Sequence, residues 1–249
     1  AVRHYSSTDQ VFIPNPATSL IPLYWYRPLA ALSATAGMHR FMWDVHYQPL
    51  DGGGRIGGPT LSMGAIGLNT MASPTTPWVN PGPFSVQLTV NGKTYSQPIV
   101  VKADPRVRTP ALAMQQVYSL STSMYYGAID AQVAAREVQR LRDQIATQRT
   151  QATGAVAAAL DSLDAKLRAP GSSAPPGLNA LTEASAGLVA VMNILQGADV
   201  RPTAVQLRAI TTARRAADVA LAKWRAVKAV DLPALNAKLT AAGRTPLAP

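Results

Sequence analysis

Residues 82–107 read Gly-Pro-Phe-Ser-Val-Gln-Leu-Thr-Val-Asn-Gly-Lys-Thr-Tyr-Ser-Gln-Pro-Ile-Val-Val-Lys-Ala-Asp-Pro-Arg-Val, and this stretch decides the expected fold. In its first half, apolar and polar residues alternate, as they do in a strand with one buried face. The apolar positions are Phe84, Val86, Leu88 and Val90. Asn91-Gly92 is a preferred pair for a two-residue type I′ turn. The stretch therefore predicts a β-hairpin in which residues 93–102 return antiparallel to the first strand.

The residues before the hairpin predict further β-structure. Met38 to Tyr47 alternates and predicts a strand, with Phe41, Trp43, Val45 and Tyr47 on one face. Residues 9–28 are rich in proline and aromatic residues, which favours an extended edge segment or a loop. Residues 48–83 are rich in Gly, Pro, Ser and Thr and predict a long loop in contact with a partner or neighbouring surface. Residues 1–106 are therefore predicted to form a β-sandwich of immunoglobulin or fibronectin type.

After Pro105 the alternation stops, and apolar residues recur at intervals of three and four. This spacing predicts one long helix from Pro110 to Ile145, followed by helices at about 151–168, 178–196 and 203–230. A short last helix is predicted, capped by Asp231 and ended by Gly243. Short connections favour antiparallel neighbours, so residues 107–249 are predicted to be an up-down bundle of about four long helices, with a long hairpin carrying added helices as the alternative. The predicted fold class is α+β with two domains.

Composition narrows the classes of function. The net charge is +10, and residues 105–249 hold seventeen Lys and Arg against nine Asp and Glu. This basic part could contact polyanions or acidic glycans, but it lacks the aromatic platforms and motifs that would favour nucleic acid. The chain has no cysteine, which excludes disulfides and thiolate metal sites. No apolar run is long enough for a transmembrane segment. The start at Ala1, without Met or signal peptide, suggests a mature, processed or excised chain.

The sequence shows no catalytic constellation. His39 and His46 would face opposite sides of a strand, so no metal or cofactor site is predicted. A glycosidase needs two carboxylates facing a sugar, and only Asp44, next to Trp43, is worth testing. There is no phosphate loop and no Gly-x-Ser-x-Gly elbow. Six residues are candidates for contact with a ligand or partner: Trp25, Trp43, Asp44, Trp78, Tyr125 and Tyr126.

Several motifs carry a family resemblance. They are residues 37–47 (Gly-Met-His-Arg-Phe-Met-Trp-Asp-Val-His-Tyr), 81–84, 88–98, 104–107 and 231–236. Together they resemble the C-terminal region of large exported bacterial proteins with a sortilin-like, Asp-box β-propeller, which are commonly labelled glycosyl hydrolases. The resemblance implies a periplasmic, outer-surface or extracellular location. The propeller would lie before Ala1, so no catalytic residue of the family falls on this chain.

These observations predict a non-catalytic accessory or interaction module. It would dock on the propeller, which belongs either to the same protein or to a separate polypeptide. Otherwise it would mediate attachment to a surface or assembly, including the formation of homo-oligomers. The alternative is a substrate-binding accessory part of a glycoside hydrolase that acts on envelope or extracellular glycans through exposed tryptophans. A third hypothesis is a helical bundle that binds polyanions.

Overall fold

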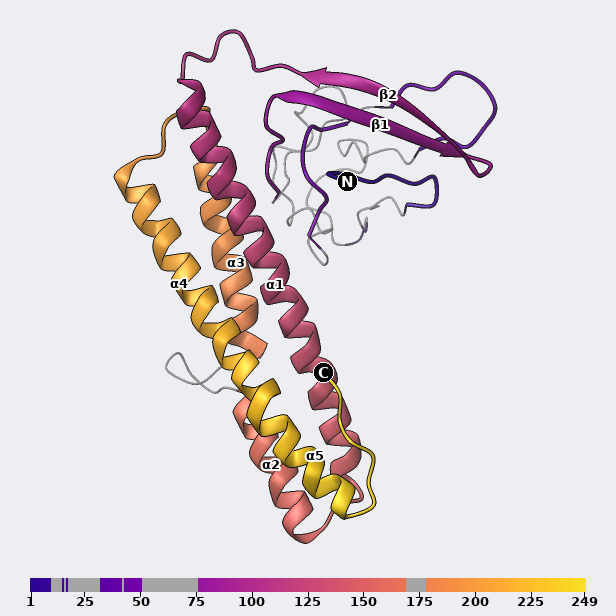
Figure 1. Cartoon of the computed structure of the whole chain (residues 1–249), viewed down its shortest axis with the longest axis vertical. Helices are drawn as coiled ribbons and strands as arrows, with labels where there is room; N and C mark the ends of the chain where they lie inside the picture. Colours follow the sequence, from indigo (N-terminus) through magenta and orange to yellow (C-terminus); the bar gives the residue numbers. More distant parts are fainter. Residues whose placement is uncertain (10–14, 16, 18–31, 42, 51–75, 169–177) are drawn as a thin grey trace. The chain divides into compact units, whose positions relative to one another are not determined.

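The computed structural model describes residues 1–9, 15, 17, 32–41, 43–50, 76–168 and 178–249. Its described part is mostly helical, with one two-stranded sheet (Figure 1). Contacts divide the chain into two units, which are described separately below. Unit 1 comprises Ala1–Ser121 and Leu195–Pro202, and unit 2 comprises Thr122–Ile194 and Thr203–Pro249.

The predicted hairpin is confirmed. Strand β1 (Gly82–Val90) pairs with β2 (Lys93–Val101) in antiparallel register, with Leu88 opposite Tyr95. Asn91 and Gly92 have φ values of 51° and 77°, the two positive values that a type I′ turn requires. Local turn chemistry alone therefore sets the register of this ribbon.

The predicted β-sandwich is wrong, and so is its immunoglobulin or fibronectin type. Among the described residues the only sheet is the hairpin, whereas a sandwich needs two packed sheets. In the segment predicted as a strand from Met38 to Tyr47, the described residues form one isolated bridge, between His46 and Trp78, and no longer ladder. Within that segment Val45 has a φ of 54°, which lies outside the extended region that a strand needs.

The side chain of Asp44 explains why the strand does not form. Its Oδ1 accepts a hydrogen bond from the backbone N–H of His46 at 3.2 Å, which is the geometry of an Asx turn. The chain therefore bends, and residues 45–48 lie between two other extended segments. Val79 N–H donates to Val45 O at 2.9 Å on one side, and Gln48 N–H donates to Val2 O at 3.0 Å on the other.

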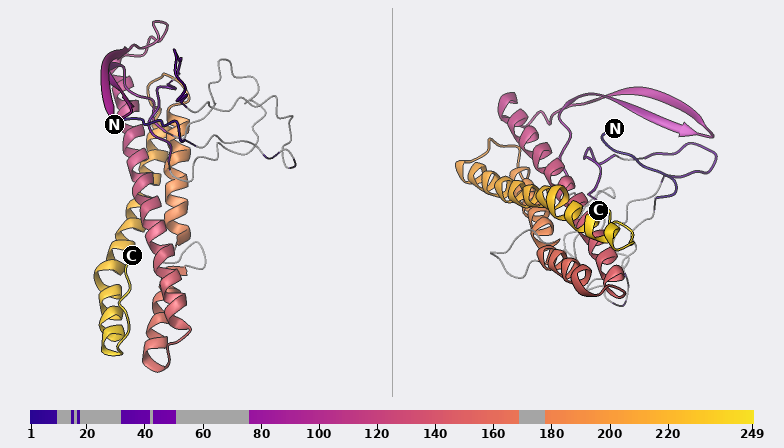
Figure 2. Two further views of the ribbon diagram at one scale, coloured as in Figure 1. Left: turned by 90° about the vertical axis from the view of Figure 1, so that its right-hand side faces the viewer. Right: turned by 60° about the horizontal axis from the view of Figure 1, so that its bottom comes forward.

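In the described part of unit 2 the four predicted long helices are present, but they lie in three antiparallel rods and not as an up-down four-helix bundle (Figures 1 and 2). The first rod is α1 (Ala111–Arg149), which begins in unit 1. The second rod consists of α2 (Gly154–Arg168) followed by α3 (Leu178–Leu195), which pack one after the other along α1. Arg142 of α1 pairs with Asp164 of α2 at 3.2 Å, and the Ser185 hydroxyl of α3 donates to Ala128 O of α1 at 3.2 Å.

The third rod is continuous from α4 (Ala204–Ala226) through a π-helix, η4 (Val227–Asp231), into α5 (Leu232–Ala241). The predicted N-cap at Asp231 is therefore wrong: it makes no capping hydrogen bond, and its carboxylate accepts from Lys166 Nζ at 2.6 Å. Pro233 has no N–H and would clash in a regular helix, so the wider π-turn before it lets the rod continue. Gly243, with φ 68°, ends the rod as predicted.

Small residues on α1 bring α3 close. Ala128 and Ala131 have no exposed surface, and a Cβ built on Gly127 would lie 3.2 Å from Leu188 Cδ1. Larger side chains of α1 and leucine-rich stripes of the other helices complete the core. They include Met124, Val138, Leu141 and Ile145 of α1, and Leu160, Leu163, Leu167, Leu181, Leu188, Leu195, Leu221, Leu235 and Leu239. Hydrophobic burial along these stripes is the main stabilising contribution in unit 2.

Candidate functional site

Three of the predicted contact residues gather around His46 in unit 1. These are Trp43, Asp44 and Trp78. Tyr125 and Tyr126 lie in unit 2, and Trp25 lies outside the described residues. Sequence reasoning treated His46 as a surface or sheet-packing residue, but the structure makes it the centre of this cluster. The signal that could have found it is the spacing Asp44-x-His46, which is typical of an Asx turn.

His46 is 4% exposed and held on two sides. Its Nδ1 lies 2.7 Å from the backbone oxygen of Asp44, which fits an imidazole that donates from Nδ1. Its ring centroid is 3.7 Å from that of Trp78. Burial lowers the pKa of His46, although the hydrogen bond with the Asp44 backbone and the Asp44 charge oppose this effect. His46 is therefore neutral at pH 7 and serves as a packing support for Trp78.

The carboxylate of Asp44 is already engaged. Its Oδ1 accepts from the Tyr5 hydroxyl at 3.3 Å and from the backbone of His46, and its Oδ2 lies 3.9 Å from Arg3 Nη2. Arg3 in turn donates to Tyr47 O at 3.2 Å and lies over the Tyr5 ring at 4.8 Å. Burial raises the pKa of the Tyr5 hydroxyl. These contacts fold the N-terminal residues onto the turn, which is a structural role for Asp44.

No second carboxylate accompanies Asp44 in these contacts. Glycoside hydrolysis needs a pair of carboxyl groups, with one on each side of the bond to be cleaved. Within the ranges that the structure describes, no three His, Asp or Glu side chains are placed to hold a metal ion. The cluster can pack and orient side chains, but its described residues do not assemble an acid–base pair.

Trp78 gives this cluster an exposed aromatic surface. Its side chain is 48% exposed although His46 covers one part of the ring. Trp43 is half-buried: its Nε1–H donates to His46 O at 3.2 Å, and its ring and that of Phe84 pack edge to face with their centroids 5.7 Å apart. Trp78 is therefore the member of the cluster that a ligand can reach, whereas Trp43 joins the turn to the base of the hairpin.

The hairpin carries four exposed apolar side chains on one of its faces. Val86, Leu88, Val90 and Tyr95 share one face of the ribbon and are 48%, 50%, 47% and 58% exposed; they are called the hairpin face below. The opposite face is polar, with hydroxyl pairs between Thr89 and Thr94 and between Ser85 and Ser96. Among the described residues, neither outer edge of the ribbon pairs with another strand.

The two tyrosines of unit 2 have different environments. Tyr125 is 5% exposed and belongs to the core, whereas Tyr126 is 55% exposed. The two rings pack edge to face with their centroids 5.2 Å apart. The basic residues of α4 lie on the surface: Arg208, Arg214, Arg215, Lys223 and Arg225 are exposed. Lys228 is bound to Glu137 at 2.8 Å, so it does not belong to this exposed set.

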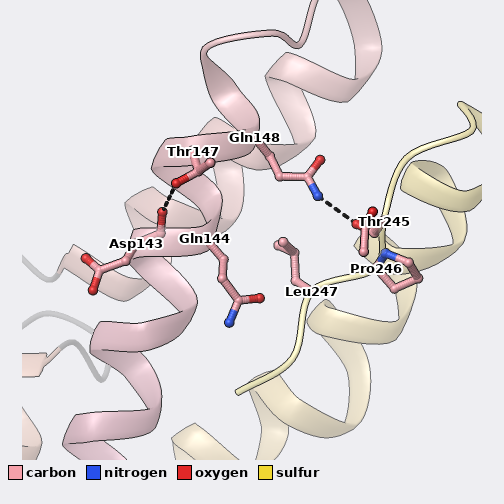
Figure 3. A pocket seen from close by; sticks show the side chains of 7 residues that line it. All are labelled: Asp143, Gln144, Thr147, Gln148, Thr245, Pro246 and Leu247. Carbon is pink, nitrogen blue, oxygen red and sulfur yellow. Dashed lines mark hydrogen bonds between the residues drawn. The ribbon is translucent and has the colours of Figure 1, made fainter.

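Unit 2 also contains a shallow pocket beside the C-terminal residues (Figure 3). Its volume is about 350 Å³. The lining residues come from α1 and from the end of the chain: Asp143, Gln144, Thr147, Gln148, Thr245, Pro246 and Leu247. The surface of the pocket is mostly apolar, and the amides of Gln144 and Gln148 add polar groups at its wall.

Comparison of the chain with protein-family models, with curated proteins and with solved structures finds no match. None of the helices in the described part of the chain is long and apolar enough to cross a membrane.

Proposed function

We propose that this chain is a non-catalytic interaction module, and that the hairpin face is the surface on which it binds a second polypeptide. The motif resemblance suggests the partner, namely the β-propeller portion of an exported protein, either on the same chain or separate. The observation that carries the proposal is the set of four apolar side chains on the hairpin face, each of which is about half exposed.

Physical chemistry favours a partner at this face. A two-stranded ribbon on its own is marginally stable in water, and exposed apolar ribbons with open edges tend to pair with other chains. Full burial of a Val or Leu side chain contributes about 1.5–3 kcal/mol, so covering these half-exposed side chains would contribute about 4 kcal/mol in total. The open edges add the main-chain hydrogen bonds of strand addition.

The test adds one charge to either face of the same ribbon. Leu88→Lys places an ammonium on the hairpin face, and Thr89→Lys places it on the polar face as the matched control. Binding of the separately produced propeller portion is measured by titration calorimetry, and self-association by sedimentation equilibrium. We expect Leu88→Lys to weaken the interaction at least tenfold and Thr89→Lys to leave it within twofold. Equal effects of both substitutions, or an absence of any association, would contradict the proposal.

The exposed indole of Trp78 supports a second candidate, the substrate-binding part of a glycoside hydrolase. A tryptophan face held by His46 and open to solvent can stack on a sugar ring, since aromatic rings combine an apolar body with a polar handle. Binding to an array of envelope and extracellular glycans tests this. Loss of glycan binding in Trp78→Ala, with retention in Leu88→Lys, would favour this candidate over the first.

A further inference from the structure

The last residues of the chain lie in a groove of unit 2. After α5 the chain turns at Gly243, and residues 244–249, called here the C-terminal segment, run along α1. Leu247 is 4% exposed and is the apolar anchor of the segment. Figure 3 shows its side chain between Gln144 and Gln148 of α1.

The groove holds the segment by its main chain. Gln144 of α1 donates to Ala248 O at 2.7 Å and accepts from Ala248 N–H at 3.0 Å. Asn236 of α5 does the same for Leu247, at 2.9 Å and 2.8 Å. A side-chain amide that makes both bonds to one residue replaces the neighbouring strand of a β-sheet. The main-chain atoms of two consecutive residues are therefore bound from two different helices, and these four hydrogen bonds do not involve the side chains of Leu247 and Ala248.

Further contacts fix the direction of the segment without filling the groove. Gln148 Nε2 donates to Thr245 O at 2.7 Å, and Arg244 donates to the backbone oxygens of Gln148 and Gln151. Between the segment and α1 there remains the pocket of about 350 Å³. The segment is thus held by directed hydrogen bonds and one leucine rather than by close packing on every side.

We propose that this groove is a peptide-binding site, and that the C-terminal segment of a second copy of the chain can occupy it by exchange. The contacts involve main-chain atoms and one leucine, so a second copy offers the same groups. The segment joins the helical rod through Gly243, where a change of backbone angles would redirect it. Reciprocal exchange gives a closed two-fold dimer. The inference concerns unit 2 and does not depend on the hairpin face.

The test uses two complementary full-length variants. Leu247→Asp keeps the groove but removes the anchor of the segment. Gln144→Ala combined with Asn236→Ala keeps the segment but removes four main-chain hydrogen bonds from the groove. Each variant alone should sediment as a monomer, and an equal mixture should form a 1:1 dimer. The control is a chain that carries all three substitutions, and it should form no dimer when it is mixed with either variant.

A labelled peptide of residues 243–249 tests the groove without a second copy. Fluorescence anisotropy should show saturable binding to Leu247→Asp. Binding should be at least tenfold weaker to the Gln144→Ala/Asn236→Ala variant, which lacks the four bonds. It should also be at least tenfold weaker to the unsubstituted chain, whose own segment competes at an effective concentration in the millimolar range. A peptide with Asp in place of its leucine is the matched negative control.

Three results decide the inference. Peptide binding together with the mixed dimer supports it. Peptide binding without a mixed dimer overturns exchange with a second copy. If Leu247→Asp keeps the far-ultraviolet circular dichroism of the unsubstituted chain but does not bind the peptide, the peptide site itself is overturned. If Leu247→Asp loses helicity, Leu247→Ala replaces it in both measurements and is judged by the same results.

Discussion

Removing the carboxylate of Glu137 should destabilise unit 2 more than removing any exposed ion pair. Glu137 lies on α1, and one oxygen of its carboxylate, Oε2, accepts two hydrogen bonds from the third rod. Trp224 Nε1–H donates at 2.7 Å and Lys228 Nζ donates at 2.8 Å. Lys228 also lies 5.4 Å from the centre of the Trp224 ring. The proposed perturbation is Glu137→Ala, which leaves both donors without this acceptor.

The expected size follows from the burial of the two donors. Trp224 is 2% exposed, so the substitution would leave its N–H buried without an acceptor. Losing a buried hydrogen bond to a charged group in this way costs about 2–3 kcal/mol. The Lys228 side chain is 36% exposed, so solvent screening limits its ion pair to about 0.5 kcal/mol. The free energy of unfolding should therefore fall by about 3 kcal/mol. For a domain of this size, the melting temperature should fall by roughly 6–12 °C.

Two milder variants separate the hydrogen bond from the charge. Glu137→Gln keeps an oxygen for the Trp224 N–H and should cost only about 1 kcal/mol. Lys228→Met keeps the Glu137–Trp224 bond and should cost less than 1 kcal/mol. Urea unfolding followed by circular dichroism at 222 nm reports on the helices and gives all three values. If Glu137→Ala costs no more than Lys228→Met, the Trp224 bond is not the main contribution and the reasoning is wrong.

Acid should weaken the same contact. Burial acts to raise the pKa of Glu137, but the hydrogen bonds from Lys228 and Trp224 outweigh it, so the pKa lies below its usual value. A carboxyl whose pKa is lower in the folded state stabilises the fold fully above the unfolded pKa of about 4.3. This contribution is lost as the pH falls through the lowered pKa. The urea midpoint of Glu137→Gln should therefore depend less on pH between about 5 and 3 than that of the unsubstituted chain; parallel curves would refute this.

Three further predictions concern other parts of the chain. Gly127→Ala should change the melting temperature little, because the better helix propensity of alanine offsets the 3.2 Å approach of its Cβ to Leu188 Cδ1. Gly127→Leu should overpack the contact between α1 and α3 and lower the free energy of unfolding by about 2 kcal/mol or more. Equal melting temperatures of the two variants would contradict the close helix contact. Val45 has a positive φ, which costs a non-glycine residue about 1 kcal/mol of backbone strain. Val45→Gly should remove this strain and slow amide hydrogen exchange in residues 45–48; faster exchange would show that the strain is not there. If the exposed face of α4 binds polyanions, Arg214→Glu with Arg215→Glu should lower the salt needed to elute the chain from heparin; unchanged elution would exclude that face.

The features that sequence predicts well here are those that short-range chemistry determines. Asn91-Gly92 sets the hairpin because few other residue pairs accept two positive φ angles. The three- and four-residue spacing after Pro105 locates the helices, and Gly243 ends the last one. The capping box of α4, in which Thr203 Oγ1 accepts from Gln206 N–H at 3.2 Å, is likewise readable from neighbouring residues.

The number of rods was not predictable from spacing alone. The pattern breaks at Pro202 and around Asp231 look alike in sequence, because both combine a proline with a polar residue. At the first a true helix start follows, with Thr203 as its cap. At the second the π-turn absorbs Pro233, and the carboxylate of Asp231 binds Lys166 on another helix. The contact with Lys166 joins residues 65 positions apart, so the residues around Asp231 do not reveal it.

The candidate site depends on long-range contacts as well. Nothing near His46 in the sequence indicates that it is buried, because Arg3, Tyr5 and Trp78 come from segments more than thirty residues away. Asp44 was identified as a residue worth testing, but its partners give it a structural role. Trp78 stays a predicted contact residue, and its exposure agrees with that prediction without testing it.

The mistaken sandwich and the proposed docking surface come from the same residues. Alternation in β1 shows that one face of a ribbon is suited to burial, but it does not say what covers that face. A covering sheet from residues 38–47 would have completed a sandwich, and the Asx turn at Asp44 removes it. Leu88 and Tyr95, which face each other across the ribbon, remain 50% and 58% exposed. An apolar face that the described part of its own chain leaves half exposed has the pattern of an interface, and this is why the hairpin is where a partner should be sought first.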